Sequence, residues 1–132
     1  MKTIFFRTDA FAAMGYGHLI RCISLAGHIR TRGIVPRFIL RKSEKQAEQL
    51  LDQHGFESIY ISEEKELAAI VTAAGESLAV FDINSSALFG SDADYTKMLE
   101  QHRQNGIKLV SFEEFRDHPF ASDLVIIPYI GA

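Results

Sequence analysis

A histidine directly follows two glycines near the start of the chain, in the sequence Gly15-Tyr16-Gly17-His18. Glycines let a backbone turn tightly and approach a ligand closely. Helical periodicity begins at about His18, and the N–H groups and positive dipole end of a helix start favour an anion or developing negative charge. A histidine exchanges protons near neutral pH, and this helix end favours its neutral, proton-accepting form. The pattern therefore predicts His18 as a general base.

Polar side chains also follow three apolar runs, at 2–6, 78–81 and 108–112. The carboxyl ends of parallel strands share one edge of a sheet, and ligands bind beyond that edge where the strand order reverses. We therefore expect side chains from distant parts of the sequence to join His18 there. The candidates are Arg7, Asp9, Gly15, Gly17, Asp82, Asn84, Glu113 and Glu114.

Each of these residues also has a purely structural interpretation, which the sequence leaves open. Arg7 and Asp9 can pair with each other or cap the loop. Asp82 can serve only as an acceptor for neighbouring backbone N–H groups. Glu113 and Glu114 are more typical of a solvated face.

The single cysteine, Cys22, lies within the helical pattern, which favours a small buried side chain over a reactive thiol. One cysteine excludes an internal disulfide and suggests a reducing compartment. No cluster of His, Cys, Asp and Glu has the spacing of metal ligands, so we expect no metal and no other cofactor. The histidines that we expect at the surface are His28, His54, His102 and His118.

Six apolar runs alternate with segments of helical periodicity. We expect helices from about His18 to a cap at Gly33, from Ser43 to Gly55, from Ser62 onward, and over 92–105. Glu63 and Glu64 suit the first turn of the third helix, and Ser43 and Ser62 suit N-caps. Residues 83–91 are expected to form a loop. The strands are expected at 2–6, 35–40, 56–61, 78–81, 108–112 and 124–127.

This alternation, with connections of a few residues, predicts an α/β fold. We expect residues 1–132 to form a single domain built on a doubly wound, mainly parallel, Rossmann-like sheet. Right-handed crossovers and a switch point beside the first strand predict the strand order 3-2-1-4-5-6.

Composition excludes several classes of protein. The length of 132 residues and a hydrophobic content of 47% suit one globular domain with a real core. Scattered basic residues and a net charge of -3 argue against nucleic-acid binding. Arg7 and Asp9 break the first apolar run far short of a secretory signal, and no stretch approaches the ~20 apolar residues of a membrane span. We therefore expect a cytoplasmic protein.

The two glycines also match part of the dinucleotide-binding fingerprint, G-x-G-x-x-G. Here Ile20 takes the place of the third glycine, and Arg41 and Lys42 follow the second strand instead of an acidic residue. The spacer between Arg7 and Gly15 is also long for such a turn. Because Arg41 could meet a 2′-phosphate, an NADP-dependent oxidoreductase stays a minor alternative.

A longer pattern, R-x-D-x(5)-G-x-G-H-x-x-R-C-x-x-L-A, covers the same region. It resembles the opening of the UDP-sugar hydrolases of pseudaminic acid biosynthesis, which cleave UDP-2,4-diacetamido-2,4,6-trideoxy-β-L-altropyranose, and of the related spore-coat polysaccharide proteins. Weaker similarity continues through the strand ending at Asp82, the 108–112 strand and residues 122–129. The resemblance covers essentially the whole chain but only the N-terminal half of the family's protein. The matching residues are Arg7, Asp9, Gly15, Gly17, His18, Arg21, Cys22, Leu25 and Ala26.

The resemblance implies one half of a glycosyltransferase-like protein of the two-Rossmann-domain (GT-B) type. In that family the N-terminal domain supplies the acceptor side and the catalytic histidine, here His18, and a C-terminal domain outside this chain grips the uridine diphosphate. The chain alone is therefore expected to be inactive and to bind UDP weakly. The substrate-binding residues that the resemblance implies are Arg7, Asp9, Gly15, Tyr16, Gly17, Arg21, Asp82 and Asn84.

Two departures from the family pattern keep other functions open. Asn84 stands where members often carry a tyrosine, and Glu113 and Glu114 replace the usual aspartates. A glycosyltransferase-like protein and a non-catalytic sugar-binding or interaction domain are therefore alternatives to a hydrolase. We also expect exposed apolar surface near the carboxyl ends of the strands, where the second domain or a second copy of the chain would sit.

Overall fold

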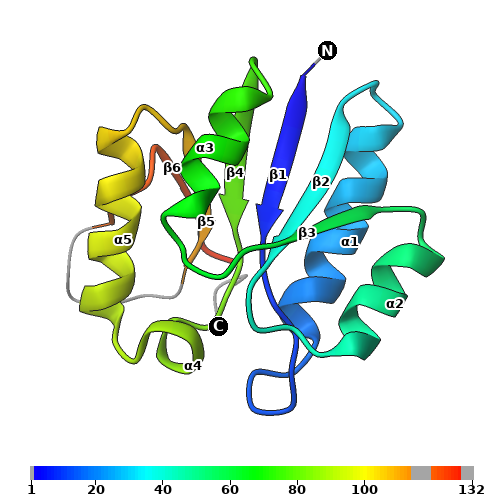
Figure 1. Cartoon of the computed structure of the whole chain (residues 1–132), viewed down its shortest axis with the longest axis horizontal. Coiled ribbons are helices and arrows are strands. Elements are labelled where there is room, and N and C mark those ends of the chain that lie inside the picture. Colours follow the sequence, from blue (N-terminus) through cyan, green and yellow to red (C-terminus); the bar gives the residue numbers. More distant parts are fainter. Residues whose placement is uncertain (1, 114–119, 129–132) are drawn as a thin grey trace.

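The computed structural model describes residues 2–113 and 120–128, and its centre is a six-stranded parallel sheet with helices on both faces (Figure 1). The strand order is β3-β2-β1-β4-β5-β6, and every pair of neighbours is parallel. The predicted fold class and strand order are thus confirmed. The strands are β1 (Thr3–Arg7), β2 (Val35–Leu40), β3 (Glu57–Tyr60), β4 (Ser77–Phe81), β5 (Leu109–Phe112) and β6 (Leu124–Ile126).

Two apolar cores lie on opposite faces of the sheet, because successive side chains of a strand point to opposite faces. Phe6 packs in the core beneath α1 (Gly17–Arg30) and α2 (Lys45–Gln53). Its neighbour Phe5 packs in the other core, beneath the remaining three helices. These are α3 (Glu66–Ala73), α4 (Ser85–Phe89) and α5 (Asp92–Gln104).

Two predicted helix starts are wrong, because their serines take other roles. The N-cap of α2 is Glu44, while the Ser43 hydroxyl accepts a hydrogen bond from the Ala10 N–H across the loop. The third helix begins at Glu66 rather than near Ser62. The Glu66 carboxylate accepts hydrogen bonds from the Ser62 and Glu63 N–H groups, which fixes a turn ahead of the helix.

The segment 83–91 contains a short helix, α4, where the sequence predicted only a loop. Asn84 is its N-cap, and the side-chain oxygen accepts a hydrogen bond from the Ala87 N–H at 3.0 Å. Gly90 ends the helix with φ of 82°, a conformation that glycine adopts without strain. Leu88 supplies the buried apolar contact of this helix.

His102 is buried, so the prediction of a surface histidine is wrong there. Only 3% of the residue is exposed, and its ring centroid lies 5.8 Å from that of Phe81. His28 and His54 are exposed, as predicted, and His118 lies outside the described residues. The signal was present in the sequence, because His102 continues the inward stripe of α5 at helical spacing. The other members of that stripe are Tyr95, Met98 and Leu99.

Burial of His102 makes stability depend on pH. Burial lowers its pKa from the ordinary value of about 6.5; the Glu64 carboxylate opposes this shift and the Arg7 guanidinium adds to it. Among the described residues its Nε2 has no hydrogen-bond partner. The unfolded chain therefore takes up a proton that the folded chain resists, so this stabilisation is present above pH 6.5 and is lost as the pH falls.

We expect the free energy of unfolding to fall below pH 6.5 by up to ~1.4 kcal/mol per pH unit from this group. Urea unfolding at pH 7.5 and pH 5.5 measures the difference. His102→Leu should remove this part of the pH dependence, whereas the exposed His28→Leu should keep it. The same loss in the parent and in His102→Leu would assign the effect to other groups.

Candidate functional site

The candidate site lies at the carboxyl ends of β1 and β4, where the strand order reverses. The register pairs Arg7 with Phe81, so Asp82 comes beside Thr8, and the Asp82 N–H donates to the Arg7 carbonyl at 3.1 Å. Val80, two residues earlier, belongs to the core under α1. By alternation Asp82 faces the same helix, and it meets three side chains of α1.

A tight turn delivers the chain from β1 to the start of α1. The N–H groups of Met14 and Gly15 both donate to the Phe11 carbonyl, at 3.1 and 2.7 Å. Gly15 has φ of 81°, so it is the glycine that the turn requires. Gly17 is exposed and begins α1, and a Cβ there would meet no atom within 4 Å. The space over the helix start is therefore open to a ligand.

His18 and Asp82 form a hydrogen-bonded pair. His18 Nδ1 lies 2.6 Å from Asp82 Oδ1. The Asp82 side chain is fully buried, whereas 27% of the His18 side chain is exposed. A carboxylate accepts only, so it holds the imidazole hydrogen on Nδ1 and leaves Nε2 as a proton acceptor. This is the arrangement by which a carboxylate orients a histidine base.

Arg21, one turn further along α1, binds the same carboxylate with two parallel hydrogen bonds. Its Nε donates to Asp82 Oδ2 and its Nη2 to Oδ1, both at 2.6 Å. The guanidinium carbon lies 4.4 Å from the ring centroid of Phe112 on β5. Such a bidentate, charge-assisted pair fixes the plane of the carboxylate as well as its charge.

Cys22 also points at Asp82, with Sγ 3.8 Å from Oδ2. Burial, with the Asp82 charge in addition, raises the pKa of the Cys22 thiol well above its ordinary value. The thiol is therefore neutral and buried, as the sequence predicted, and not an activated nucleophile.

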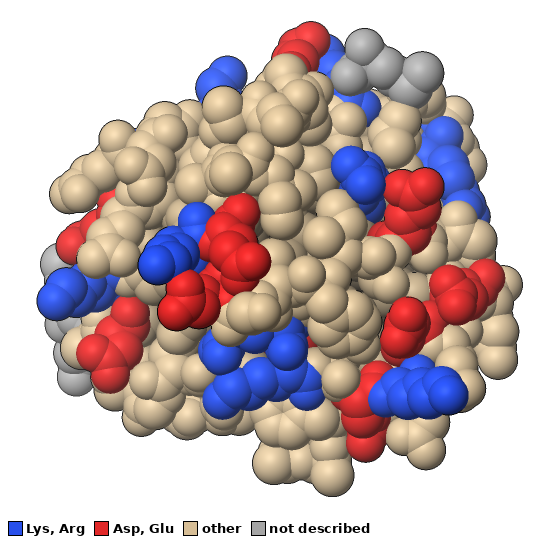
Figure 2. All heavy atoms as spheres, in the orientation of Figure 1, with Lys and Arg blue, Asp and Glu red and all other residues tan. Residues whose placement is uncertain are grey.

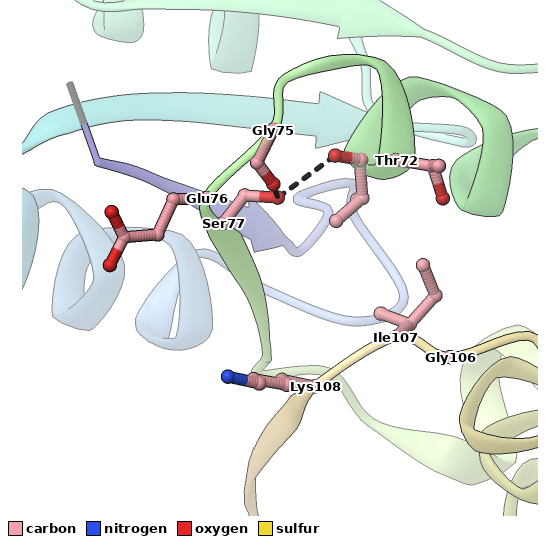
Figure 3. A pocket seen from close by; sticks show the side chains of 8 residues that line it. Thr72, Gly75, Glu76, Ser77, Gly106, Ile107 and Lys108 are labelled. Carbon is pink, nitrogen blue, oxygen red and sulfur yellow. Dashed lines mark hydrogen bonds between the residues drawn. The ribbon is translucent and has the colours of Figure 1, made fainter.

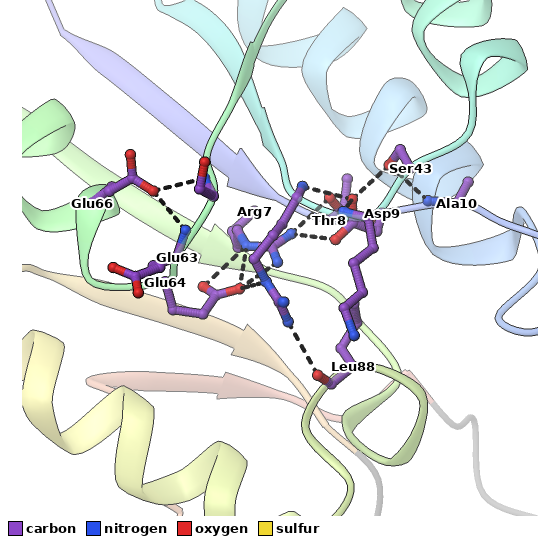
Figure 4. Close-up of polar contacts among 12 residues, drawn as sticks. Arg7, Thr8, Asp9, Ala10, Ser43, Glu63, Glu64, Glu66 and Leu88 are labelled. Carbon is purple, nitrogen blue, oxygen red and sulfur yellow. Dashed lines mark hydrogen bonds and ion pairs between the residues drawn. The ribbon is translucent and has the colours of Figure 1, made fainter.

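Arg7 and Asp9 belong to a second polar cluster, which Figure 4 shows. By alternation along β1, Arg7 lies on the face of Phe5, opposite to the face that Asp82 occupies. Arg7 is fully buried and pairs with Asp9 Oδ2 at 2.7 Å and with the Glu64 carboxylate. Burial alone would lower the pKa of Arg7, and the charges of Glu64 and Asp9 outweigh it and raise that pKa. Arg7 thus pairs with Asp9, as one of the sequence interpretations had it.

Asp9 and Glu64 tie this cluster to the loop after β2. Asp9 Oδ1 accepts from the N–H groups of Arg41 and Lys42 at 2.9 and 3.0 Å, and from the Ser43 hydroxyl at 2.6 Å. Arg41 donates to Glu64 at 2.9 Å and to the Leu88 carbonyl at 3.1 Å. These contacts bind the Arg41 side chain to protein groups, and a role at a 2′-phosphate stays untested. Arg7 and Asp9 are both buried against protein groups. Substrate binding by these two residues stays a prediction.

Tyr16 and Asn84 have protein partners in the structure. The Tyr16 hydroxyl donates to Glu44 at 2.6 Å, which links the starts of α1 and α2. Burial and the Glu44 carboxylate raise the pKa of Tyr16 to about 12. Asn84 is exposed while it caps α4. Binding roles for Gly15, Tyr16, Gly17 and Asn84 stay predictions.

Glu113 is buried, so the predicted solvated face is wrong for this residue. Its carboxylate accepts from the Ser111 hydroxyl at 2.7 Å, and Ser122 donates in turn to Ser111 at 2.6 Å. Alternation along β5 places Glu113 on the face of Leu109, opposite to the face that Asp82 occupies. It therefore does not join His18. Glu114 lies outside the described residues.

Large apolar side chains are exposed at this edge. Ile20, in the first turns of α1, and Tyr60, at the end of β3, are 52% and 45% exposed. Both lie toward the carboxyl ends of the strands, where the sequence predicted apolar surface. Part of the predicted surface, at 129–132, lies outside the described residues. A second domain or a second copy over this edge stays a prediction.

A hollow of about 240 Å³ lies at the opposite edge of the sheet, between the amino ends of β4 and β5 (Figure 3). It contains none of the predicted site residues, and its volume is small for a nucleotide-sugar. We therefore place the site by its chemistry and not by this hollow. Its lining residues are Val71, Thr72, Gly75, Glu76, Ser77, Gly106, Ile107 and Lys108.

Charge is mixed on the face shown in Figure 2, where acidic and basic side chains are interspersed. Over 2–113 and 120–128, no group of three or more His, Cys, Asp and Glu side chains could hold a metal ion. Within the same residues no helix has the length and apolar character to cross a membrane. Comparisons with family models, with curated proteins and with solved structures each return no match.

Proposed function

We propose that this chain is the catalytic half of a nucleotide-sugar hydrolase, with His18 as the general base. The observation that supports it best is the 2.6 Å contact between His18 Nδ1 and the buried carboxylate of Asp82. That contact fixes the tautomer in which Nε2 accepts a proton. The partly exposed ring stands at the switch point of a parallel sheet, where ligands of such folds bind.

The chemical step needs a base and an acceptor for charge. His18 Nε2 takes a proton from water while the water oxygen bonds to the anomeric carbon of the sugar. The bond from that carbon to the diphosphate oxygen breaks, and its electron pair leaves with the nucleoside diphosphate. The N–H groups at the start of α1, beside the open space over Gly17, suit the developing negative charge.

The substrate that we propose is a UDP-linked diacetamido-trideoxy sugar, used in nonulosonic acid or surface polysaccharide biosynthesis. Support comes from the sequence resemblance, whose His18, Arg21, Cys22 and Asp82 form one contact cluster in the structure. On this proposal a second Rossmann-like domain of a GT-B-type protein grips the uridine diphosphate. The NADP alternative loses its main support, because Arg41 is held by Glu64 and Leu88.

The test is hydrolysis of the UDP-sugar by the complete gene product in ¹⁸O-labelled water. We expect UDP and free sugar in equal amounts, with the label on the anomeric hydroxyl of the sugar and not on the diphosphate. UDP release that requires an added acceptor sugar would instead indicate a transferase. No release from a folded protein, or thermal stabilisation by NADPH and not by the UDP-sugar, would overturn the proposal.

A further inference from the structure

The Asp82 carboxylate accepts hydrogen bonds from two side chains, those of Arg21 and His18. Its Oδ1 accepts from both His18 Nδ1 and Arg21 Nη2, and its Oδ2 accepts from Arg21 Nε, all at 2.6 Å. Asp82 is fully buried, so solvent does not screen it. Whatever fixes the position and charge of this carboxylate therefore also acts on the imidazole.

The geometry decides which tautomer of His18 the site favours. A carboxylate oxygen only accepts hydrogen bonds, so Asp82 favours a hydrogen on His18 Nδ1. The two hydrogen bonds from Arg21 fix the plane of the carboxylate in which this contact is made. The third titratable group at the carboxylate, Cys22, is a neutral thiol, because burial raises its pKa.

The position of Arg21 is itself fixed from a third element. Its guanidinium lies over the ring of Phe112 on β5, at 4.4 Å, while Nε and Nη2 donate to Asp82, the residue after β4. A planar guanidinium can stack on a ring and bind a carboxylate with two bonds at once, which an ammonium cannot do. The geometry therefore needs arginine at this position and not merely a positive charge.

We infer that Arg21 is a positioning residue, which orients the Asp82 carboxylate so that His18 keeps its hydrogen on Nδ1 and Nε2 accepts a proton. The inference deepens the proposed function, since it assigns to Arg21 an action through Asp82 in place of the substrate contact that the sequence suggested. The effect of Arg21 on the His18 ring can be measured whether or not the protein turns over a UDP-sugar.

The variants separate charge from geometry. Arg21→Gln removes the charge, Arg21→Lys keeps the charge but loses the two-bond geometry, and Arg21→Ala leaves space for added guanidinium. Arg30→Gln is the matched control: it lies on the same helix, stacks at 4.3 Å over Phe56, and bonds the His54 carbonyl instead of Asp82. The two measurements are the ¹⁵N NMR resonances of the His18 ring in this chain, which report its tautomer, and turnover by the complete gene product.

We expect Arg21→Gln to shift the ¹⁵N resonances of the His18 ring away from those of the Nδ1–H tautomer. Arg21→Lys should shift them less, and Arg30→Gln should not shift them. Turnover at neutral pH should fall by about 10–100-fold in Arg21→Ala and recover in part with added guanidinium. Where Arg21→Ala does not fold, Arg21→Lys gives the comparison.

The two measurements test the positioning role and the proposed function separately. Unchanged His18 ring resonances in every folded Arg21 variant would overturn the positioning role, even if turnover fell. Shifted resonances with no turnover by the parent protein would uphold the positioning role and overturn the proposed function instead.

Discussion

Replacing His18 by asparagine is expected to lower the rate of UDP release by about 10²–10⁴-fold, the usual loss when a general base is removed. Asparagine has no group that takes up a proton near neutral pH, although it keeps an N–H donor. His18 stands on the first turn of α1 with part of its ring exposed, so the change removes little packing. Initial rates of UDP release by the complete gene product, with the melting temperature of each variant, give the comparison.

A second histidine on the same helix provides the control. His28 is exposed near the last turn of α1, far along the helix from the site, and His28→Asn should leave the rate unchanged. Asp82→Asn should lower the rate as well, because an amide can no longer favour the Nδ1–H tautomer. Equal rates for the parent and His18→Asn would make His18 a structural partner of Asp82 and assign the chemistry to another group.

The sheet could be predicted from the sequence because its central strands, β1 and β4, are apolar and largely buried. Short apolar runs such as 35–40 and 78–81 leave little choice of structure, and the helical segments between them require parallel crossovers. The bounds of the six strands in the structure differ from the predicted ones by one residue or less at each end. The strand order then follows from the handedness of the crossovers and one switch point.

Some local features were not predicted, because a tertiary contact outweighed the local sequence preference there. The segment 83–91 is polar enough for a loop, yet Asn84 as a cap and Leu88 as a buried contact make a short helix there. The sequence suggests that Glu113 is solvated, yet it is buried, and its carboxylate accepts a hydrogen bond from the Ser111 hydroxyl. Such outcomes depend on partners that lie on the neighbouring strand or beyond it, which periodicity does not show.

The site was predicted as a location rather than as a set of contacts. The sequence predicts His18 and Asp82 at one edge of the sheet, because the carboxyl ends of parallel strands lie at the same edge. It could not tell that Asp82 faces α1 while Arg7 faces α3, since this depends on a register of single residues. The sequence predicts Glu64 only as a residue of a helix first turn. Its ion pair with Arg7 in the structure was not predicted.

Replacing Arg7 by methionine is expected to destabilise the fold by about 3–5 kcal/mol, the usual cost of leaving a buried charge without its partner. Methionine has a similar length, so the change removes charge more than volume. Asp9 would keep its N–H and hydroxyl donors from the loop after β2 but would lose the cation that balances it, while Glu64 would keep Arg41. Urea unfolding at neutral pH measures the difference in the free energy of unfolding.

Arg37, on the neighbouring strand β2, is the matched control for this substitution. It pairs with Glu57 at 3.1 Å, but 35% of the Arg37 side chain and 75% of the Glu57 side chain are exposed, so water screens the pair. Arg37→Met should therefore cost about 1 kcal/mol or less. Adding Asp9→Asn to Arg7→Met should recover part of the loss, because it removes the carboxylate that Arg7 balances and keeps an oxygen for the loop donors. A small and equal effect of Arg7→Met and Arg37→Met would show that water reaches the Arg7 cluster and that its charges contribute little to stability.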